Sequence, residues 1–160
     1  MAKASTPVPD GYHTITPSLT LDNAAQTIDW YKKALGAEEV GRSVGPDGKV
    51  MHAELRIGNS RFMMNDVMMG AKSPQAYGGS PASLWLYVED SDALFKRAVD
   101  AGATVQMPMD DCFWGDRAGA VADPSGYTWW IATRKEELTM AEIQQRAAEA
   151  FKQMGEPTSR

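Results

Sequence analysis

His52 and Glu54 have the residue types and the spacing for acid–base chemistry. In an extended segment, residues two apart lie on one face of a strand. The Glu54 carboxylate could then orient the imidazole of His52 as a general base, or both side chains could belong to a displaced metal site. The same pattern also fits a polar outer strand face, because Met51, Ala53 and Leu55 alternate with these two residues as an apolar face.

Asp116 and Arg117 form a second charged pair, directly after Gly115. Asp116 joins His52 and Glu54 as a candidate catalytic residue. The planar guanidinium of Arg117 could bind an anionic ligand through two parallel N–H groups. It could equally form a surface ion pair beside the glycine turn.

Aromatic and methionine side chains are the other distinctive group, with 10 Met and 5 Trp residues in the chain. Such side chains often line ligand pockets. Alternation puts Ser83, Trp85 and Tyr87 on one face of a predicted strand, whereas Trp129 and Trp130 point to opposite faces of another. Flat aromatic walls would suit a planar ligand, unless the rings pack on one another and leave no cavity. The predicted ligand-binding residues are Trp130, Trp85, Met63, Asn65, Ser83, Tyr87, Trp114 and Arg117.

The composition of the chain bears on its partners and on its cellular compartment. Lys and Arg total 16 against 21 Asp and Glu, a formal net charge of −5, whereas a nucleic-acid partner would need a basic surface. No run reaches the roughly 18 apolar residues of a membrane span, and the first residues lack the apolar core of a signal peptide. The single cysteine, Cys112, excludes an internal disulfide and fits a reducing compartment. We therefore expect a cytoplasmic protein with no nucleic-acid or membrane partner.

Cys112 is also a possible nucleophile, but its sequence neighbours argue against that role. Asp110 and Asp111 precede it directly. Negative charges nearby would raise the pKa of the thiol, whereas a reactive cysteine needs a base or a positive field beside it.

Two stretches of the chain show the same order of predicted elements. In the first, residues 28, 31 and 35 follow helical spacing between Asp22-Asn23, which offers an N-cap, and Gly36, which supplies a C-terminal stop. Pro17 marks the segment before this helix as an edge strand or a bulge. The predicted elements are a strand at 13–21, a helix at 24–35 and strands at 38–43, 50–57 and 61–65.

The second stretch repeats the first. Ser18-Leu19-Thr20-Leu21 matches Ser83-Leu84-Trp85-Leu86 at an offset of 65 residues, and Leu35-Gly36-Ala37 matches Ala101-Gly102-Ala103 at an offset of 66. This pattern indicates an internal duplication of a βαβββ unit. The predicted elements of the second unit are a strand at 83–88, a helix at 90–101 and strands at 103–107, 118–122 and 127–133.

The fold class that follows is α+β, with two tandem βαβββ units and a C-terminal helix. In the tail, Thr139 and Glu142 have capping-box spacing, and the apolar stripe of Ile143, Ala147 and Phe151 would dock on this chain or on a partner subunit. The long connecting loop between the two units, residues 67–82, could be a plain linker or a lid over a pocket. The predicted boundaries are an arm at 1–12, a domain at 13–134 with units at 13–66 and 83–134, a connecting loop at 67–82, and a helix and tail at 135–160.

Several short segments match a known family in their order and spacing. They are Ile28-Asp29-Trp30-Tyr31, Leu35-Gly36-Ala37, Met51-His52-Ala53-Glu54, Leu86-Tyr87-Val88-Glu89-Asp90, Gly115-Asp116-Arg117 and Asp123-Pro124-Ser125-Gly126-Tyr127. With them the chain resembles the vicinal oxygen chelate superfamily, and within it the PhnB-like branch of glyoxalase- and bleomycin-resistance-like proteins. The resemblance implies cupped mixed sheets of the glyoxalase/bleomycin-resistance fold. It also implies a homodimer, since members commonly complete their pockets across two chains.

Metal-dependent members of this superfamily hold a divalent cation with four side chains. The resemblance assigns these positions to Thr16, Met64 or Asn65, Ser83 or Trp85, and Trp130. Hydroxyl, amide, thioether and indole groups are poor ligands for a catalytic metal. No cofactor is therefore expected, and a divalent metal would bind only if a displaced site exists.

The predicted function is metal-independent binding of a small, planar or aromatic molecule in the cupped pocket, of the drug-sequestration type. The negative net charge favours a cationic or neutral ligand, although salt screens this effect. The alternative is a glyoxalase-like lyase or isomerase, metal-free or with a displaced metal site around His52, Glu54 and Asp116. A third reading is a relic whose tryptophans fill the cup.

Overall fold

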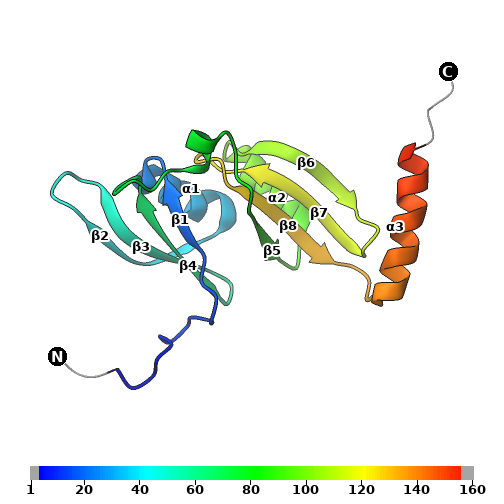
Figure 1. Cartoon of the computed structure of the whole chain (residues 1–160), viewed down its shortest axis with the longest axis horizontal. Helices are drawn as coiled ribbons and strands as arrows, with labels where there is room; N and C mark the ends of the chain where they lie inside the picture. The colour runs from blue at the N-terminus through cyan, green and yellow to red at the C-terminus, as the bar shows by residue number, and fades with distance from the viewer. Residues whose placement is uncertain (1–3, 156–160) are drawn as a thin grey trace.

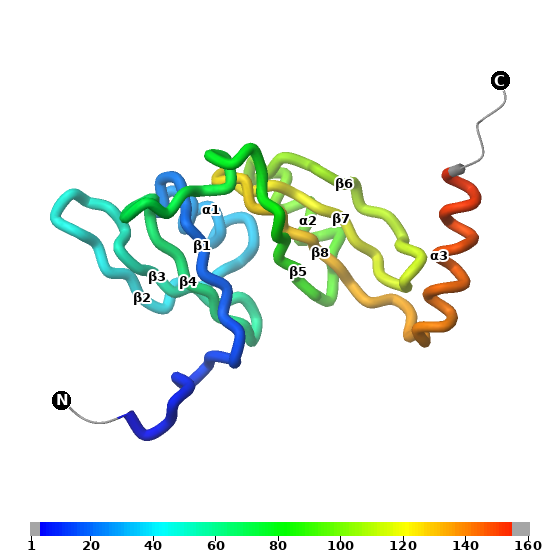
Figure 2. The backbone as a smooth tube through the Cα atoms, in the orientation of Figure 1, coloured from blue at the N-terminus to red at the C-terminus, as the bar shows by residue number. Residues whose placement is uncertain are grey.

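The computed structural model describes residues 4–155 as two four-stranded sheets that lie side by side (Figure 1). Figure 2 traces the chain from one unit to the other through a segment that holds the short 3-10 helix η1 (Pro74–Tyr77). The first unit comprises β1 (Ser18–Leu21), α1 (Ala24–Leu35), β2 (Glu38–Val44), β3 (Val50–Ile57) and β4 (Ser60–Asp66). The second comprises β5 (Ser83–Tyr87), α2 (Ser91–Asp100), β6 (Thr104–Asp111), β7 (Asp116–Ala122) and β8 (Thr128–Arg134).

The two sheets have the same topology. Their strand orders are β1-β4-β3-β2 and β5-β8-β7-β6. In each sheet the first and last strands of the unit pair in parallel, with Ser18 opposite Met63 and Ser83 opposite Thr128, and the other pairs are antiparallel. The predicted α+β fold with two βαβββ units is therefore confirmed.

Element boundaries differ from the predicted ones mainly at three strand ends. β1 begins at Ser18 rather than at residue 13, after Pro17, which has no N–H to donate to a neighbouring strand. β6 continues to Asp111 instead of ending at 107, and β7 begins at Asp116 instead of 118. These two strands stay paired across an irregularity after Met107, so their ladder ends only at Asp111 opposite Arg117. The other predicted element ends differ by at most one residue.

The predicted N-cap of the first helix is wrong. Asn23 has a left-handed backbone with φ of 51° and its side chain makes no capping hydrogen bond. Instead Asp66, at the end of β4, accepts hydrogen bonds from Ala24 N and Val50 N, both at 2.7 Å. A carboxylate 42 residues away therefore caps α1, where it also meets the positive end of the helix dipole.

The two helices contact each other and join the units. Trp30 Nε1 on α1 donates to Ala101 O at 2.9 Å, just beyond the end of α2. In the other direction Arg97 donates to Lys33 O at 2.6 Å and to Lys32 O at 3.2 Å. Arg97 thereby satisfies carbonyl groups that the last turn of α1 leaves without helical partners.

A buried carboxylate, Asp123, fastens the second unit to the first. Its Oδ2 accepts from Tyr31 Oη of α1 at 2.6 Å and from Trp129 Nε1 at 2.9 Å. Its Oδ1 accepts from the backbone N–H groups of Ser125 and Tyr127, at 2.9 and 3.0 Å. Burial raises the pKa of Asp123 in spite of these four donors. Burial and the neighbouring Asp123 raise the pKa of Tyr31 well above its ordinary value, so Tyr31 stays a donor.

The C-terminal helix α3 (Met140–Gly155) stands apart from both sheets (Figure 1). Its predicted capping box is confirmed, because Thr139 N donates to Glu142 Oε2 at 2.8 Å and Glu142 N donates to Thr139 Oγ1 at 3.3 Å. Phe151, in the predicted apolar stripe, remains 63% exposed. Ile143 and Ala147 of the stripe are half-buried, so its Phe151 end is the exposed part, and docking on this chain or on a partner subunit stays a prediction.

Substitution Tyr31→Phe removes one donor from the buried Asp123. A hydrogen bond to a charged group contributes about 1.5–3 kcal/mol to stability, so the free energy of unfolding in urea is expected to fall by that amount. Trp30→Phe is the matched control, because Trp30 donates to a carbonyl rather than to a carboxylate, and its loss should be smaller. An unchanged urea midpoint for Tyr31→Phe would show that Asp123 does not depend on this donor.

Substitution Arg97→Ala is expected to lower the free energy of unfolding by about 1–2 kcal/mol, since two hydrogen bonds across the helix interface are lost. The adjacent Lys96→Ala serves as its control, because Lys96 pairs with the exposed Asp100 on the surface of its own helix, and loss of such a surface pair should change stability little. Thermal unfolding followed by circular dichroism compares the two. Equal midpoints would argue against a role for Arg97 between the units.

Candidate functional site

Two tryptophans stack on the face of the second sheet that α2 does not cover. Trp85 on β5 and Trp130 on β8 are register partners, with ring centroids 4.8 Å apart and planes 3° from parallel. Trp129 points the opposite way and is buried in the core with Ile131. The predicted alternation of Trp129 and Trp130 is therefore what the structure shows. Trp85 stays 40% exposed, so the stack offers ring surface to a ligand.

Asp116 organises two further rings beside this stack. Its Oδ2 accepts hydrogen bonds from Tyr87 Oη and from Trp114 Nε1, both at 3.0 Å. The Trp85 ring lies 6.1 Å from Tyr87 and 6.3 Å from Trp114. Burial and the hydrogen bond to Asp116 raise the pKa of Tyr87, which keeps it protonated and donating at neutral pH. We call Trp85, Tyr87, Trp114 and Trp130 the aromatic cluster.

Asp116 was predicted as a catalytic candidate, but its position under the aromatic cluster was not predicted. Ala118 and Ala120 are buried on the same face of β7 as Asp116, and Ala120 lies opposite Trp130. These small side chains leave room above the strand for the rings. Extending the small-residue alternation back by two positions would have placed Asp116 on that face, but β7 was predicted to begin only at residue 118.

A second group of side chains lies on the first sheet and is polar. His52 Nε2 is 3.2 Å from Glu54 Oε1, and Arg61 Nη1 is 3.8 Å from Glu54 Oε2. Arg61 also stacks over the Tyr12 ring at 5.2 Å. The Tyr12 hydroxyl and then His52 lower the pKa of Glu54. We call Tyr12, His52, Glu54 and Arg61 the polar cluster.

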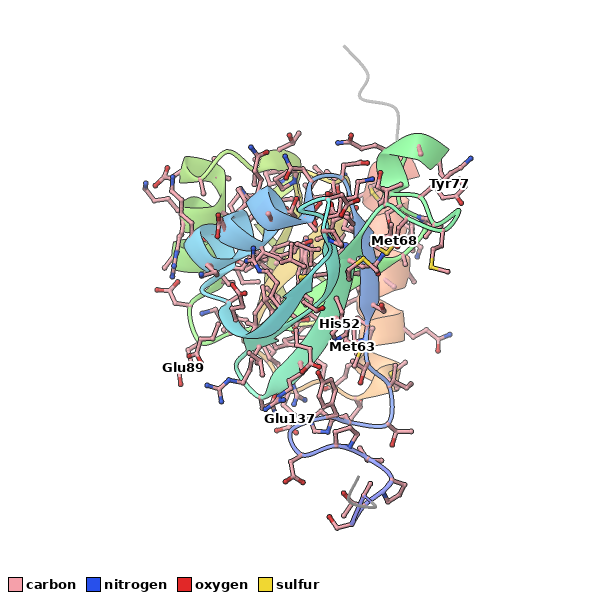
Figure 3. The ribbon with its side chains drawn as sticks, turned by 90° about the vertical axis from the view of Figure 1, so that its left-hand side faces the viewer. His52, Met63, Met68, Tyr77, Glu89 and Glu137 are labelled. Carbon is pink, nitrogen blue, oxygen red and sulfur yellow. The ribbon has the colours of Figure 1, made fainter. Side chains whose placement is uncertain are left out.

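Met63 and Asn65 share the face of the polar cluster, since Met63 is the register partner of Glu54. Figure 3 shows His52 and Met63 close together on this sheet. Asp116, the third catalytic candidate, lies on the other sheet. A single chain therefore does not assemble His52, Glu54 and Asp116 into one site, nor does it place Met63 and Asn65 on the sheet that carries the aromatic cluster.

A groove of about 790 Å³ runs between the two units. It is bordered by the segment before β1, the hairpin between β3 and β4, and strand β5. Ser83, Trp85 and Tyr87 of the predicted ligand-binding set line it, together with His13 and Ile15. The edge of the aromatic cluster thus opens into a groove large enough for a small molecule.

Arg117 does not belong to this surface. Its guanidinium binds Asp92 of α2 through Nε at 2.7 Å and Nη2 at 2.8 Å, and it reaches Asp111 at 3.3 Å. Arg117 therefore lies on the side of the sheet that carries α2, opposite the aromatic cluster. Of the two predicted alternatives, the structure shows the ion pair, with Asp92 and Asp111.

The positions that the resemblance assigns to metal ligands do not suit a metal here. Met64 is fully buried in the core, which leaves Asn65 on the open face of β4. The Thr16 hydroxyl donates to His13 O at 3.4 Å, and Trp130 is stacked. Among residues 4–155, no three His, Cys, Asp or Glu side chains gather in a way that could hold a metal ion. The donor set therefore does not fit the metal of the metal-dependent members.

Cys112 has the unreactive environment that its neighbours predict. Burial, followed by the charges of Asp110 and Asp116, raises the pKa of its thiol. Because the thiolate is the nucleophilic form, a raised pKa disfavours covalent catalysis at this position.

In the described part of the chain, no helix is long and apolar enough to cross a membrane.

Comparison with known proteins places this geometry in a family. A family model described as the glyoxalase/bleomycin resistance protein/dioxygenase superfamily matches residues 12–131. The uncharacterized protein Mb0911c of Mycobacterium bovis is 48% identical over 135 residues, which cover 81% of this chain and 89% of that protein.

Two solved structures have the same fold. The Arabidopsis thaliana gene product At5g48480 is 28% identical with a TM-score of 0.63, over 78% of this chain and 99% of that one. TioX from Micromonospora sp. ML1 is 24% identical with a TM-score of 0.61, over 79% and 100%. With its duplicated βαβββ units and its match over residues 12–131, the chain belongs to the glyoxalase/bleomycin resistance protein/dioxygenase superfamily.

Proposed function

We propose that this protein binds a small planar or aromatic molecule without a metal, in the manner of a drug-sequestration protein of the PhnB-like branch. The observation that carries the proposal is the parallel Trp85–Trp130 stack, which remains partly exposed on an open sheet face. Binding of this kind needs no cofactor. We propose the cytoplasm as the location of the protein, because its single cysteine would stay reduced there.

The aromatic cluster is organised before a ligand arrives. Asp116 holds the Tyr87 hydroxyl and the Trp114 indole, and Trp85 lies between their rings and Trp130. Aromatic pairs contribute about 0.5–1.5 kcal/mol beyond the area they bury. Rings already fixed by hydrogen bonds lose little conformational entropy when a ligand stacks on them. The two tryptophans contact each other but leave outer ring surface free, so they do not close the site.

We also propose that the binding unit is a homodimer. Met63 and Asn65 belong to the predicted ligand-binding set, yet they lie on the first sheet while the aromatic cluster lies on the second. The first unit of a second copy, placed over the aromatic cluster, would bring the two groups together. Such a dimer would enclose the ligand between the polar cluster of one copy and the rings of the other.

Binding of acridine, a planar neutral probe, tests the ligand site. We expect acridine to quench tryptophan fluorescence, and we expect Trp130→Ala and Trp85→Ala each to weaken binding about tenfold, which corresponds to ~1.4 kcal/mol of lost stacking. Trp30→Phe is the control, because Trp30 lies on α1 at the interface between the helices. It should leave the dissociation constant unchanged.

Absence of quenching in the wild-type protein would contradict planar-ligand binding. Near-stoichiometric metal in the purified protein would contradict metal independence. It would favour the alternative of a displaced metal site that includes His52 and Glu54. Elemental analysis of the same preparation measures this directly.

Sedimentation equilibrium tests the dimer. The wild-type chain is expected to have twice the mass of one chain at micromolar concentration. Substitution Met63→Lys puts a charge on the face that we propose to be covered, and it should shift the equilibrium toward monomer. Met69→Lys is the matched control, since Met69 is 97% exposed in a loop. A monomeric wild-type protein at every concentration would overturn the proposed assembly.

A further inference from the structure

Asp116 is an unusual carboxylate to find beneath aromatic rings. It is only 5% exposed, and its side-chain hydrogen bonds come from two neutral donors, Tyr87 Oη and Trp114 Nε1. Both bonds end on Oδ2. Within residues 4–155 no side-chain donor is bonded to Oδ1. The carboxylate is therefore held in place but keeps an acceptor oxygen uncommitted.

The basic side chains around Asp116 do not neutralise it. Arg117 is bound by two carboxylates on the opposite face of the sheet. Arg134, the register partner of Asp116 on β8, lies on the same face. Its charge partly offsets the rise in the pKa of Tyr87, but its guanidinium is 3.5 Å from Glu137. Lys135 borders a shallow cavity with Asp116, but in the described part of the chain no ion pair joins the two. Among residues 4–155 Asp116 therefore forms no ion pair, although it lies directly beside the aromatic cluster.

A buried charge without a partner is costly, and a bound cation relieves that cost. Aromatic faces attract cations as well, because the electron-rich face of the ring carries partial negative charge. Trp85, Tyr87, Trp114 and Asp116 therefore all favour positive charge at the same place. The charge on Asp116 also contributes to the raised pKa of the nearby Cys112 thiol, which is consistent with a negative local potential.

We propose that the aromatic cluster selects planar cations, such as heteroaromatic rings with a fixed positive charge, and that Asp116 supplies the counter-charge. The inference rests on the proposed function, because it names the ligand class for the same surface. Stacking on Trp85 and Trp130 accounts for planarity. Asp116 accounts for charge, and so the two contributions can be measured separately.

Two probes of nearly the same shape separate charge from planarity. N-methylacridinium is a permanent cation, and acridine is neutral at pH 8. Both are titrated into the wild-type protein at low salt and followed by tryptophan quenching and calorimetry. We expect N-methylacridinium to bind about tenfold more tightly, in line with a desolvated cation–π contact and a charge pair. Added salt should reduce this ratio.

Asp116→Asn tests the residue, since asparagine keeps an oxygen that can accept from Tyr87 and Trp114 but has no charge. It should bring the affinity ratio close to one while acridine still binds. Asp111→Asn is the matched control, because it removes the same charge from the neighbouring strand at a side chain that is 80% exposed. It should preserve most of the preference.

The outcomes distinguish this inference from the proposed function. If both probes bind the wild-type protein equally, the cation preference is wrong and planar-ligand binding stands. Binding of neither probe overturns both. Should Asp111→Asn abolish the preference as fully as Asp116→Asn, the effect comes from overall charge and Asp116 has no special part in it. The wild-type ratio decides the first two outcomes even if Asp116→Asn fails to fold.

Discussion

The arrangement of the two units depends on one buried carboxylate. Asp123 lies in the turn before β8 and accepts hydrogen bonds from Tyr31 in the first unit and from Trp129 in the second. Burying a charge is costly unless its oxygens are hydrogen-bonded, and here two side chains and two backbone groups bond both oxygens of Asp123. Because Tyr31 reaches Asp123 only if α1 lies against the second unit, the need to satisfy this charge fixes how the units pack.

That packing also buries Trp129 in the core and leaves Trp130 on the open face of the sheet. Trp129 contacts Tyr31 and Phe62 in the core, so the alternation of β8 sends Trp130 to the opposite face. The open face would be an aggregation liability if it were flat and apolar. Here Asp116 bonds two of its rings and makes the surface partly polar.

Much of this fold could be predicted from local sequence, because helix α1 follows its apolar period from end to end, and strand β3 follows its alternation from Ala53 onward, although Met51 is exposed. The cap of α1 could not be predicted, since Asp66 is distant in sequence and reaches Ala24 only after β4 has paired with β1. The alternation of side chains along the strands predicted the faces on which Trp85 and Trp130 lie. The position of Asp116 under the rings was missed, because strand pairing starts β7 two residues before Ala118, its first small apolar residue.

The division of polar and aromatic side chains between the two sheets follows from the duplication itself. Each unit covers one sheet face with its own helix and leaves the other open, so neither open face can be buried by local structure. On one of these faces Glu54 and Arg61 of the polar cluster place opposite charges 3.8 Å apart. The other face carries the stacked rings, and part of their apolar surface remains exposed to water. A ligand or a second copy that covers Trp85 and Tyr87 would therefore bury the apolar surface that the fold leaves exposed.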